Sequence, residues 1–218
     1  MKLYGFFRSL ATYRVKVALA LKGVPFDEVA VDIFGGGQHD PAYLKLNPQA
    51  VVPALLPEDG GPPLFQSMAI LEYLEEAYPV PALLPVDPRG RARVRGLALI
   101  AVADGHPLVT PRVRGYLEKE FGASEEDRTR WSAHWTLKSL QAIEAHLAEA
   151  ATGRFCHGDG VTLADIGLAS QCVAATAYFK CDTASVPNAM RVYGECMKLP
   201  AFSRAHPMNQ AAAAPPVR

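Results

Sequence analysis

The first part of the chain alternates short apolar runs with helical patterns. An apolar run over residues 2–7 predicts a strand, and residues 11–22 place apolar side chains at steps of three and four, which is typical of a helix. Gly23 fits the position after that helix, because glycine accepts a positive φ at low cost. Residues 29–31 predict a second strand. A strand, a helix and a strand in this order predict a parallel pair with a right-handed crossover.

The same domain continues to residue 79. Residues 40–46 begin with an Asp-Pro pair, which caps and starts a short helix. Two short strands flank the turn residues 58–61, and a helix follows up to Tyr78. Gly35-Gly36-Gly37 predicts a flexible loop, and it lacks the G-x-G-x-x-G spacing of a nucleotide site. The order β-α-β-α-β-β-α over residues 1–79 predicts a thioredoxin-like α/β domain.

The proline-rich residues 79–90 predict a linker, after which the pattern becomes helical throughout. His106-Pro107 is expected to bend or break the first helix. Thr162 and Asp165 form a capping box that opens a nearly all-apolar helix, which belongs in the middle of a bundle. Residues 90–210 therefore predict an all-α domain. Its expected helices cover 89–105, a stretch from 124, a stretch from 162, and 190–198; residues 211–218 are expected to form a loose tail.

The composition narrows the function classes. Lys+Arg and Asp+Glu number 22 each, so the net charge gives no general attraction to nucleic acid or to a membrane surface. Apolar runs stay below the roughly 18 residues that span a bilayer, and the N-terminus has no leader pattern, so a cytoplasmic location is expected. The four cysteines lack a C-x-x-C pair and are expected to be buried. The six histidines are scattered, and no metal site is predicted.

Residues 47–78 carry the candidate chemistry. Pro53 interrupts a strand, and a cis bond after Val52 would turn the backbone groups of Val52 outward, toward an extended ligand. Gln66 and Ser67 stand where a strand ends and a helix begins. A helix start with a hydroxyl and free N–H groups suits a carboxylate. Two backbone sites and an anion receptor suit a small peptide.

These motifs resemble the glutathione-binding half of the glutathione transferases. The similarity is carried by Val-Pro-Ala-Leu at 52–55 and Gln-Ser-Met-Ala-Ile-Leu-Glu-Tyr-Leu at 66–74. Segments near 91, 103, 153 and 162 narrow it to the zeta class, the maleylacetoacetate and maleylpyruvate isomerases. The resemblance implies the glutathione transferase fold, a thioredoxin-like domain followed by an all-α domain. It also implies glutathione as cofactor, a homodimer, and a place in aromatic amino acid catabolism.

The family's reaction needs a glutathione thiolate, and a free thiol with a pKa of about 8.5 is mostly protonated at neutral pH. Ser9 starts the first helix directly after the first strand, so its hydroxyl and the helix N-terminus can both stabilise the anion. An N-cap role would explain the same position. Similar enzymes carry Ser-Ser-Cys here, whereas this chain has Leu10 and Ala11 after Ser9.

The resemblance also assigns the ligand contacts. For glutathione, Gln66 and Ser67 would bind the γ-glutamyl carboxylate, Val52 the cysteinyl backbone, and Gln38 the glycine end. Ser9 would contact the sulfur.

For the second substrate, Arg8, His106 and Arg112 would bind carboxylates, because a dicarboxylate needs paired cations in a mostly dry site. Exposed arginines are often only solvated, and a lone histidine often packs at a helix end. The segment 174–179 lacks the arginine that similar enzymes carry, which weakens the clamp.

The expected reaction is addition of the thiolate to a conjugated cis double bond of a small dicarboxylic keto acid, rotation, and elimination to the trans alkene. Glutathione conjugation or dehalogenation of an α-halo acid needs the same thiolate and is the first alternative. A glutathione or hydrophobe binder without catalysis is the second, and a structural or partner-binding role the third.

Overall fold

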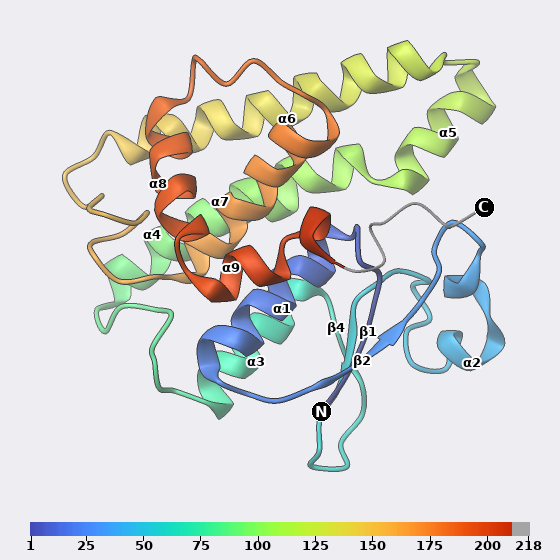
Figure 1. Cartoon of the computed structure of the whole chain (residues 1–218), viewed down its shortest axis with the longest axis horizontal. Helices are drawn as coiled ribbons and strands as arrows, with labels where there is room; N and C mark the ends of the chain where they lie inside the picture. The colour runs from blue at the N-terminus through green and yellow to red at the C-terminus, as the bar shows by residue number, and fades with distance from the viewer. Residues whose placement is uncertain (211–218) are drawn as a thin grey trace. The chain divides into compact units, whose positions relative to one another are not determined.

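The computed structural model describes residues 1–210 of the chain (Figure 1). The tail expected over 211–218 lies outside these residues. Packing divides the chain into two compact units: Met1–Ala82 together with the segment from Pro200 onward, and Leu83–Leu199.

The first unit contains a four-stranded mixed sheet in the order β2-β1-β3-β4. Its strands are β1 (Lys2–Gly5), β2 (Asp27–Ala30), β3 (Ala54–Leu56) and β4 (Leu64–Phe65). β2 runs parallel to β1, which confirms the crossover expected from the sequence. β3 pairs antiparallel with β1 and with β4. The element order is the thioredoxin-like one.

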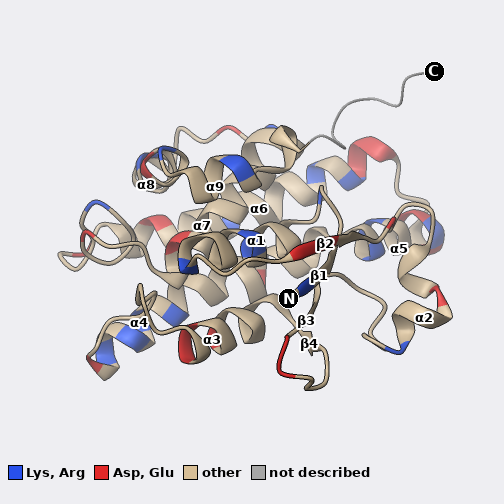
Figure 2. Cartoon of the chain, turned by 60° about the horizontal axis from the view of Figure 1, so that its bottom comes forward, with Lys and Arg blue, Asp and Glu red and all other residues tan. Residues whose placement is uncertain are grey.

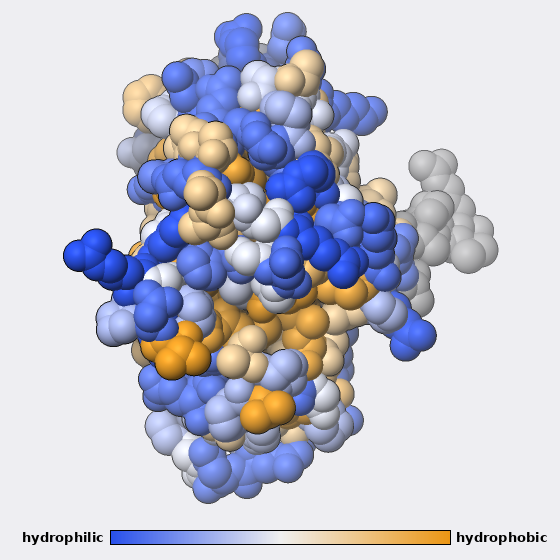
Figure 3. Space-filling view, turned by 90° about the vertical axis from the view of Figure 1, so that its left-hand side faces the viewer, coloured by the Kyte–Doolittle hydropathy of each residue, from blue (hydrophilic) through white to orange (hydrophobic). Residues whose placement is uncertain are grey.

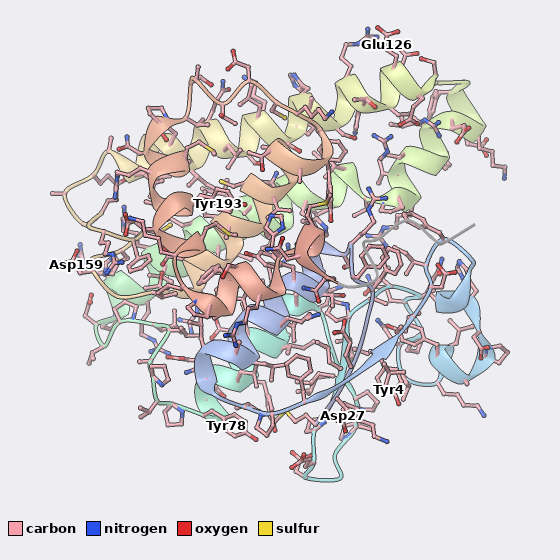
Figure 4. All side chains as sticks on the ribbon, in the orientation of Figure 1. Tyr4, Asp27, Tyr78, Glu126, Asp159 and Tyr193 are labelled. Atoms are coloured by element: carbon pink, nitrogen blue, oxygen red, sulfur yellow. The ribbon has the colours of Figure 1, made fainter. Side chains whose placement is uncertain are left out.

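Helices lie on both faces of this sheet (Figure 1). They are α1 (Leu10–Lys22), the 3-10 turn η1 (Gly37–His39), α2 (Pro41–Leu44) and α3 (Ser67–Ala77). α1 and α3 pack against each other on one face, and α2 lies on the other. On the α2 side, Phe6, Tyr43 and Val52 belong to one buried cluster, which Tyr4 of β1 joins (Figure 4). Burying each such side chain contributes about 1.5–3 kcal/mol.

A buried ion pair fixes α1 against α3. Lys22 at the end of α1 donates to Glu75 Oε2 at 2.6 Å and to the carbonyl oxygen of Pro81 at 2.6 Å. The Lys22 side chain is fully buried. Gly23 follows with φ of 66° and ends α1, as expected. The pair therefore holds the helix end and the start of the linker together.

The last described segment belongs to the first unit, whereas the sequence analysis placed it in the helical domain. α9 (Pro200–Ala205) packs against α1. His206 meets the Tyr13 ring at a centroid distance of 6.3 Å. Lys16 donates to Gln210 Oε1 at 2.5 Å and to Glu28 Oε2 at 2.7 Å. The small apolar face of α9 thus completes the outer side of α1.

The second unit is built of helices and helical turns. They are α4 (Pro88–Leu99), the π-helical turn η2 (Ile100–Gly105), the 3-10 turn η3 (His106–Val109), α5 (Pro111–Phe121), α6 (Glu125–Leu147), α7 (Leu163–Val173), the π-helical turn η4 (Ala174–Tyr178) and α8 (Pro187–Met197). Every residue of α7 is buried, as the all-apolar pattern predicted. Asp165 accepts from Thr162 N–H at 2.7 Å and from Cys156 N–H at 2.8 Å. The capping box therefore also fastens the preceding loop.

The break expected near His106 is observed, and it takes up eleven residues. α4 ends at Leu99, and η2 and η3 fill the chain as far as Thr110. A Cβ at Gly105 would lie 2.5 Å from Ser139 Oγ and 2.6 Å from Gln171 Nε2. Gln171 Nε2 donates to Ser139 Oγ at 2.7 Å. Only glycine therefore fits where η2 approaches α6 and α7.

The surface carries charges of both signs. Basic residues recur along α4, while acidic residues are scattered over several elements (Figure 2). On the face shown in Figure 3, hydrophilic side chains prevail and hydrophobic ones form smaller groups. Over residues 1–210, no helix combines the length and the apolar character that a membrane crossing requires.

Candidate active site

Ser9 is the N-cap of α1. Its Oγ accepts a hydrogen bond from Thr12 N–H at 3.2 Å, and its own N–H donates to Phe6 O at 2.9 Å. The N-cap alternative is therefore realised. It is compatible with the catalytic role, because the Oγ accepts in this contact and its O–H hydrogen can still be donated. The half-buried hydroxyl stands at the positive end of the α1 dipole.

The turn that presents Ser9 is fixed from within. Thr12 Oγ1 accepts from Phe6 N–H at 3.3 Å. A Cβ at Gly5 would lie 2.4 Å from Thr12 Cγ2, so the strand end must be glycine for α1 to pack this closely. Leu10 is buried and Ala11 half-buried, where similar enzymes carry a hydroxyl and a thiol. Among residues 9–11, Ser9 is thus the one with a side-chain hydroxyl that can contact the sulfur of a ligand.

Val52 has the expected backbone geometry. The Val52–Pro53 peptide bond is cis. The β3 ladder begins at Ala54, opposite Tyr4, so the backbone groups of Val52 lie before the paired stretch. The preceding carbonyl, of Val51, accepts from Tyr43 Oη at 2.7 Å and from Asn47 Nδ2 at 2.8 Å. These two bonds hold the approach to Pro53.

Gln66 and Ser67 form the start of α3. Gln66 has φ of 65°, an uncommon value for a residue other than glycine, and its Nε2 donates to Gln49 Oε1 at 2.7 Å. Ser67 is buried and its Oγ accepts from Arg14 Nε at 3.1 Å. Burial lowers the pKa of Arg14 to about 9, so the guanidinium stays charged at neutral pH. A cation under a helix N-terminus strengthens the expected carboxylate receptor.

Two residues of this receptor were not predicted as parts of it. Arg14, on α1, reaches the start of α3 through its hydrogen bond to Ser67. Gln49 was not singled out, and its contact with Gln66 crosses 17 positions of the sequence. Gln49 lies in no predicted helix or strand, so its position gave no sign of a role in the site.

Gln38 lies in η1 and is half-buried. Within residues 1–210, its Oε1 is buried and has no hydrogen-bond partner. Buried polar atoms are normally satisfied, so this oxygen is suited to a ligand N–H group. Arg8, by contrast, is exposed, and its guanidinium carbon lies 5.8 Å from the centre of the Phe34 ring.

The other two candidate cations belong to the second unit. His106 is the first residue of η3, and Arg112 is an exposed residue in the first turn of α5. Arg8 is in the first unit, so a joint clamp of Arg8, His106 and Arg112 remains a prediction. The η4 turn has no arginine. Its Thr176 hydroxyl donates to Cys172 O at 2.8 Å.

The chain's own thiols are poor nucleophiles. Burial raises the pKa of all four cysteines: Cys156, Cys172, Cys181 and Cys196. Three of them are buried, as expected, and Cys181 is half-buried. Burial also raises the pKa of Tyr193, on α8 (Figure 4), to about 12. Sulfur chemistry at neutral pH therefore requires a thiol from a ligand.

In the first unit, packing and hydrogen bonds link three of the predicted glutathione residues: Ser9, Val52 and Ser67. Phe6, whose carbonyl accepts from Ser9, and Val52 share one buried cluster. Arg14, on the same helix as Ser9, reaches Ser67. A hydroxyl at one helix start and an anion receptor at a second helix start define a site for a small acidic thiol.

Comparison with known proteins agrees with this class of site. Residues 1–76 match the family model described as "Glutathione S-transferase, N-terminal domain". The maleylpyruvate isomerase of Ralstonia sp is 45% identical over 212 residues, covering 96% of this chain and 98% of that protein.

Solved structures agree. A holo maleylpyruvate isomerase, a bacterial glutathione S-transferase of the zeta class, is 44% identical with a TM-score of 0.93; the match covers 98% of this chain and 100% of that one. A maleylacetoacetate isomerase of Methylobacterium extorquens AM1, with bound malonate and GSH, is 45% identical with a TM-score of 0.95, covering 99% and 100%. The chain belongs to the zeta class of glutathione S-transferases.

The predictions of family, of fold class, of an enzyme and of glutathione as cofactor are confirmed by these matches. The roles assigned to single residues stay predictions.

Proposed function

We propose that this chain catalyses a glutathione-dependent cis–trans isomerisation of a small, conjugated dicarboxylic keto acid. The observation that carries the proposal is the pairing of the Ser9 hydroxyl with the Arg14–Ser67 receptor in one unit. The zeta-class relatives named as isomerases support the same reaction, and one relative has bound GSH and malonate, which is a small dicarboxylate.

The residues present fit glutathione. Ser67 and the N–H groups at the start of α3 would hold the γ-glutamyl carboxylate, supported by the buried charge of Arg14. Val52 would pair with the cysteinyl backbone from its position ahead of β3. The buried Oε1 of Gln38 would accept from the glycine end. When bound, glutathione supplies the thiolate that adds to the alkene and leaves after rotation.

The chain's own groups would lower the barrier at two points. Ser9 Oγ–H, with the α1 dipole, favours the ionised sulfur over the thiol. Negative charge then grows on the acceptor's carbonyl oxygen, and Arg8, His106 and Arg112 would stabilise it and bind the carboxylates. The side chains of Leu10 and Ala11 cannot donate a hydrogen bond, so Ser9 is the one side chain of residues 9–11 that can donate to the sulfur.

A second candidate function is supported by the same substitutions. With Leu10, Ala11 and no arginine in 174–178, the site lacks groups that similar isomerases carry. Conjugation of glutathione, or dehalogenation of an α-halo acid, needs the thiolate and a less specific acceptor pocket. A glutathione or hydrophobe binder without catalysis would bind glutathione and turn over neither kind of acceptor.

The experiment is a steady-state assay of three acceptors: a cis-configured conjugated keto acid such as maleylacetone, dichloroacetate, and an uncharged aryl halide. The proposal expects turnover of the keto acid with no net consumption of glutathione. Turnover of the other two alone would favour the second candidate, and binding without turnover would favour the non-catalytic one.

The assembly and location complete the proposal. A homodimer and a cytoplasmic location are expected by analogy with the family, and a small electrophile is the expected partner, without nucleic acid. Sedimentation that gives the mass of one chain at micromolar concentration would refute the dimer.

A further inference from the structure

The triglycine loop, Gly35-Gly36-Gly37, follows an aromatic side chain at the surface of the first unit. Phe34 is 65% exposed, and its N–H donates to Asp32 Oδ1 at 3.0 Å. Gly37 N–H closes the loop on Asp32 O at 2.7 Å. A Cβ at Gly35 would lie 2.5 Å from Asp32 Oδ2, and Gly36 has φ of 83°. The glycines therefore let the loop wind tightly around Asp32 and turn Phe34 outward.

The Phe34 ring contacts the residue that precedes Ser9. The Arg8 guanidinium carbon lies 5.8 Å from the ring centre, within the range of a cation–π contact. On another side, the Phe6 ring meets Phe34 edge-on, with centroids 5.1 Å apart and an angle of 84°. Phe6 is buried in the core of the unit. The Phe34 ring thus packs against the buried Phe6 ring and contacts the Arg8 guanidinium.

We infer that Phe34 is a positioning residue, which holds the guanidinium of Arg8, the residue before Ser9, as a receptor for a carboxylate of the acceptor. This rests on the proposed function, in which Arg8 binds that carboxylate. A surface arginine has many rotamers, and ordering them costs free energy whenever a ligand binds. The ring restricts those rotamers beforehand, so less of the ordering cost falls on binding.

The inference gives the triglycine loop a role that serves both ligands. Phe34 precedes the glycines and faces Arg8, whereas Gln38 follows them and offers its buried Oε1. One loop would thus set the carboxylate receptor for the acceptor and a contact for glutathione. The acceptor class that this arrangement selects is an acid whose carboxylate lies close to the reactive carbon, in preference to an uncharged electrophile.

The test measures binding by titration calorimetry on the full chain, with glutathione and with S-(1,2-dicarboxyethyl)glutathione as probes. Phe34→Leu is expected to weaken binding of the dicarboxylate conjugate about threefold and to leave glutathione binding unchanged. Phe34→Trp keeps an aromatic face and is expected to retain the affinity. Phe121→Leu, at a 71% exposed ring on α5, is the matched control and is expected to change neither.

A double-mutant cycle completes the test. In an Arg8→Gln background, Phe34→Leu is expected to add no further loss for the conjugate. An equal loss in both backgrounds, a loss of glutathione affinity, or a Trp variant that behaves as the Leu variant would overturn the inference. Absence of isomerase turnover, with this binding difference intact, would overturn the proposed reaction and leave the role of Phe34 standing.

Discussion

Arg14 Nε donates to Ser67 Oγ at 3.1 Å, and this bond joins the helix that starts at Ser9 to the helix that starts at Ser67. Both residues are buried, so the guanidinium charge acts through protein and not through water. The two helix starts that the proposal assigns to the sulfur and to the carboxylate are therefore linked by a buried hydrogen bond. Loss of this hydrogen bond is therefore expected to weaken glutathione binding at both helix starts.

Arg14→Met is expected to weaken glutathione binding about tenfold, roughly 1.4 kcal/mol, because Ser67 loses its donor and the receptor its cation. Thermal unfolding with and without glutathione measures this as a smaller ligand-induced rise in Tm. Arg89→Met, at an exposed position of α4, is the control. An undiminished rise in Tm for Arg14→Met would show that the receptor does not need the charge.

The buried Lys22–Glu75 pair should matter for stability. Glu75→Leu is expected to lower the free energy of unfolding by about 3 kcal/mol, because it leaves the charged Lys22 ammonium buried beside the neutral Pro81 carbonyl and without its carboxylate partner. Urea denaturation measures the change. Lys198→Met breaks an exposed pair with Glu195 and is expected to cost less than about 1 kcal/mol. Equal costs for the two variants would contradict this view of Lys22.

Two glycines in adjacent elements should respond in opposite directions. Gly105→Ala is expected to cost about 1–3 kcal/mol, since the new methyl group would overlap Ser139 and Gln171. Gly96→Ala, within α4 and with open space around it, is expected to stabilise the chain by up to about 1 kcal/mol. Chemical denaturation of both variants tests the pair. A harmless Gly105→Ala would mean that η2 can shift without cost.

His206 should make stability depend on pH. Burial lowers the pKa of His206 below its ordinary value of 6.5, and its Nδ1 accepts from Met208 N–H at 3.2 Å. The unfolded chain therefore binds the proton more readily, so stability falls as the pH drops from about 6.5 toward the lower folded pKa. Lys16, which is paired with Glu28, donates to Gln210 of the same segment.

His206→Asn keeps a capping acceptor and removes the titration. Its free energy of unfolding is expected to change less between about pH 7.5 and pH 5.5 than that of the parent chain. Equal slopes for the two proteins would assign the pH dependence to other groups.

The sequence predicted most of the first unit, because its signals are local. Gly23 marked the end of α1, Asp40 capped α2, and Pro53 marked the interrupted strand; all three are observed. α9 was not expected, since it is short and its place is set by contacts with α1, far away in the sequence.

In the second unit, the helix start expected at residue 124 and the capping box at Thr162 predicted α6 and α7. α5 was not expected, and none of its residues is buried, so it contributes no core positions that a sequence pattern could reveal. The π-helical turns η2 and η4 could not be predicted either. For η2, the close packing of Gly105 against Ser139 and Gln171 is a tertiary relationship.

Of the candidate site, sequence motifs identified Ser9, Gln66 and Ser67, which lie at helix starts. The contacts that support these residues could not be predicted from the sequence, because they join distant parts of the chain. Arg14 contacts Ser67, which lies 53 positions later in the chain. Phe34 contacts Arg8, which lies 26 positions earlier.

The central claim is that the Ser9 hydroxyl ionises the thiol of bound glutathione, and titration of the thiolate by its ultraviolet absorbance in the binary complex tests it most directly. In the parent chain the thiol is expected to titrate well below about 8.5, and in Ser9→Ala close to that free value, while Ser185→Ala matches the parent. Identical titration of the parent and the Ser9→Ala variant would contradict the account.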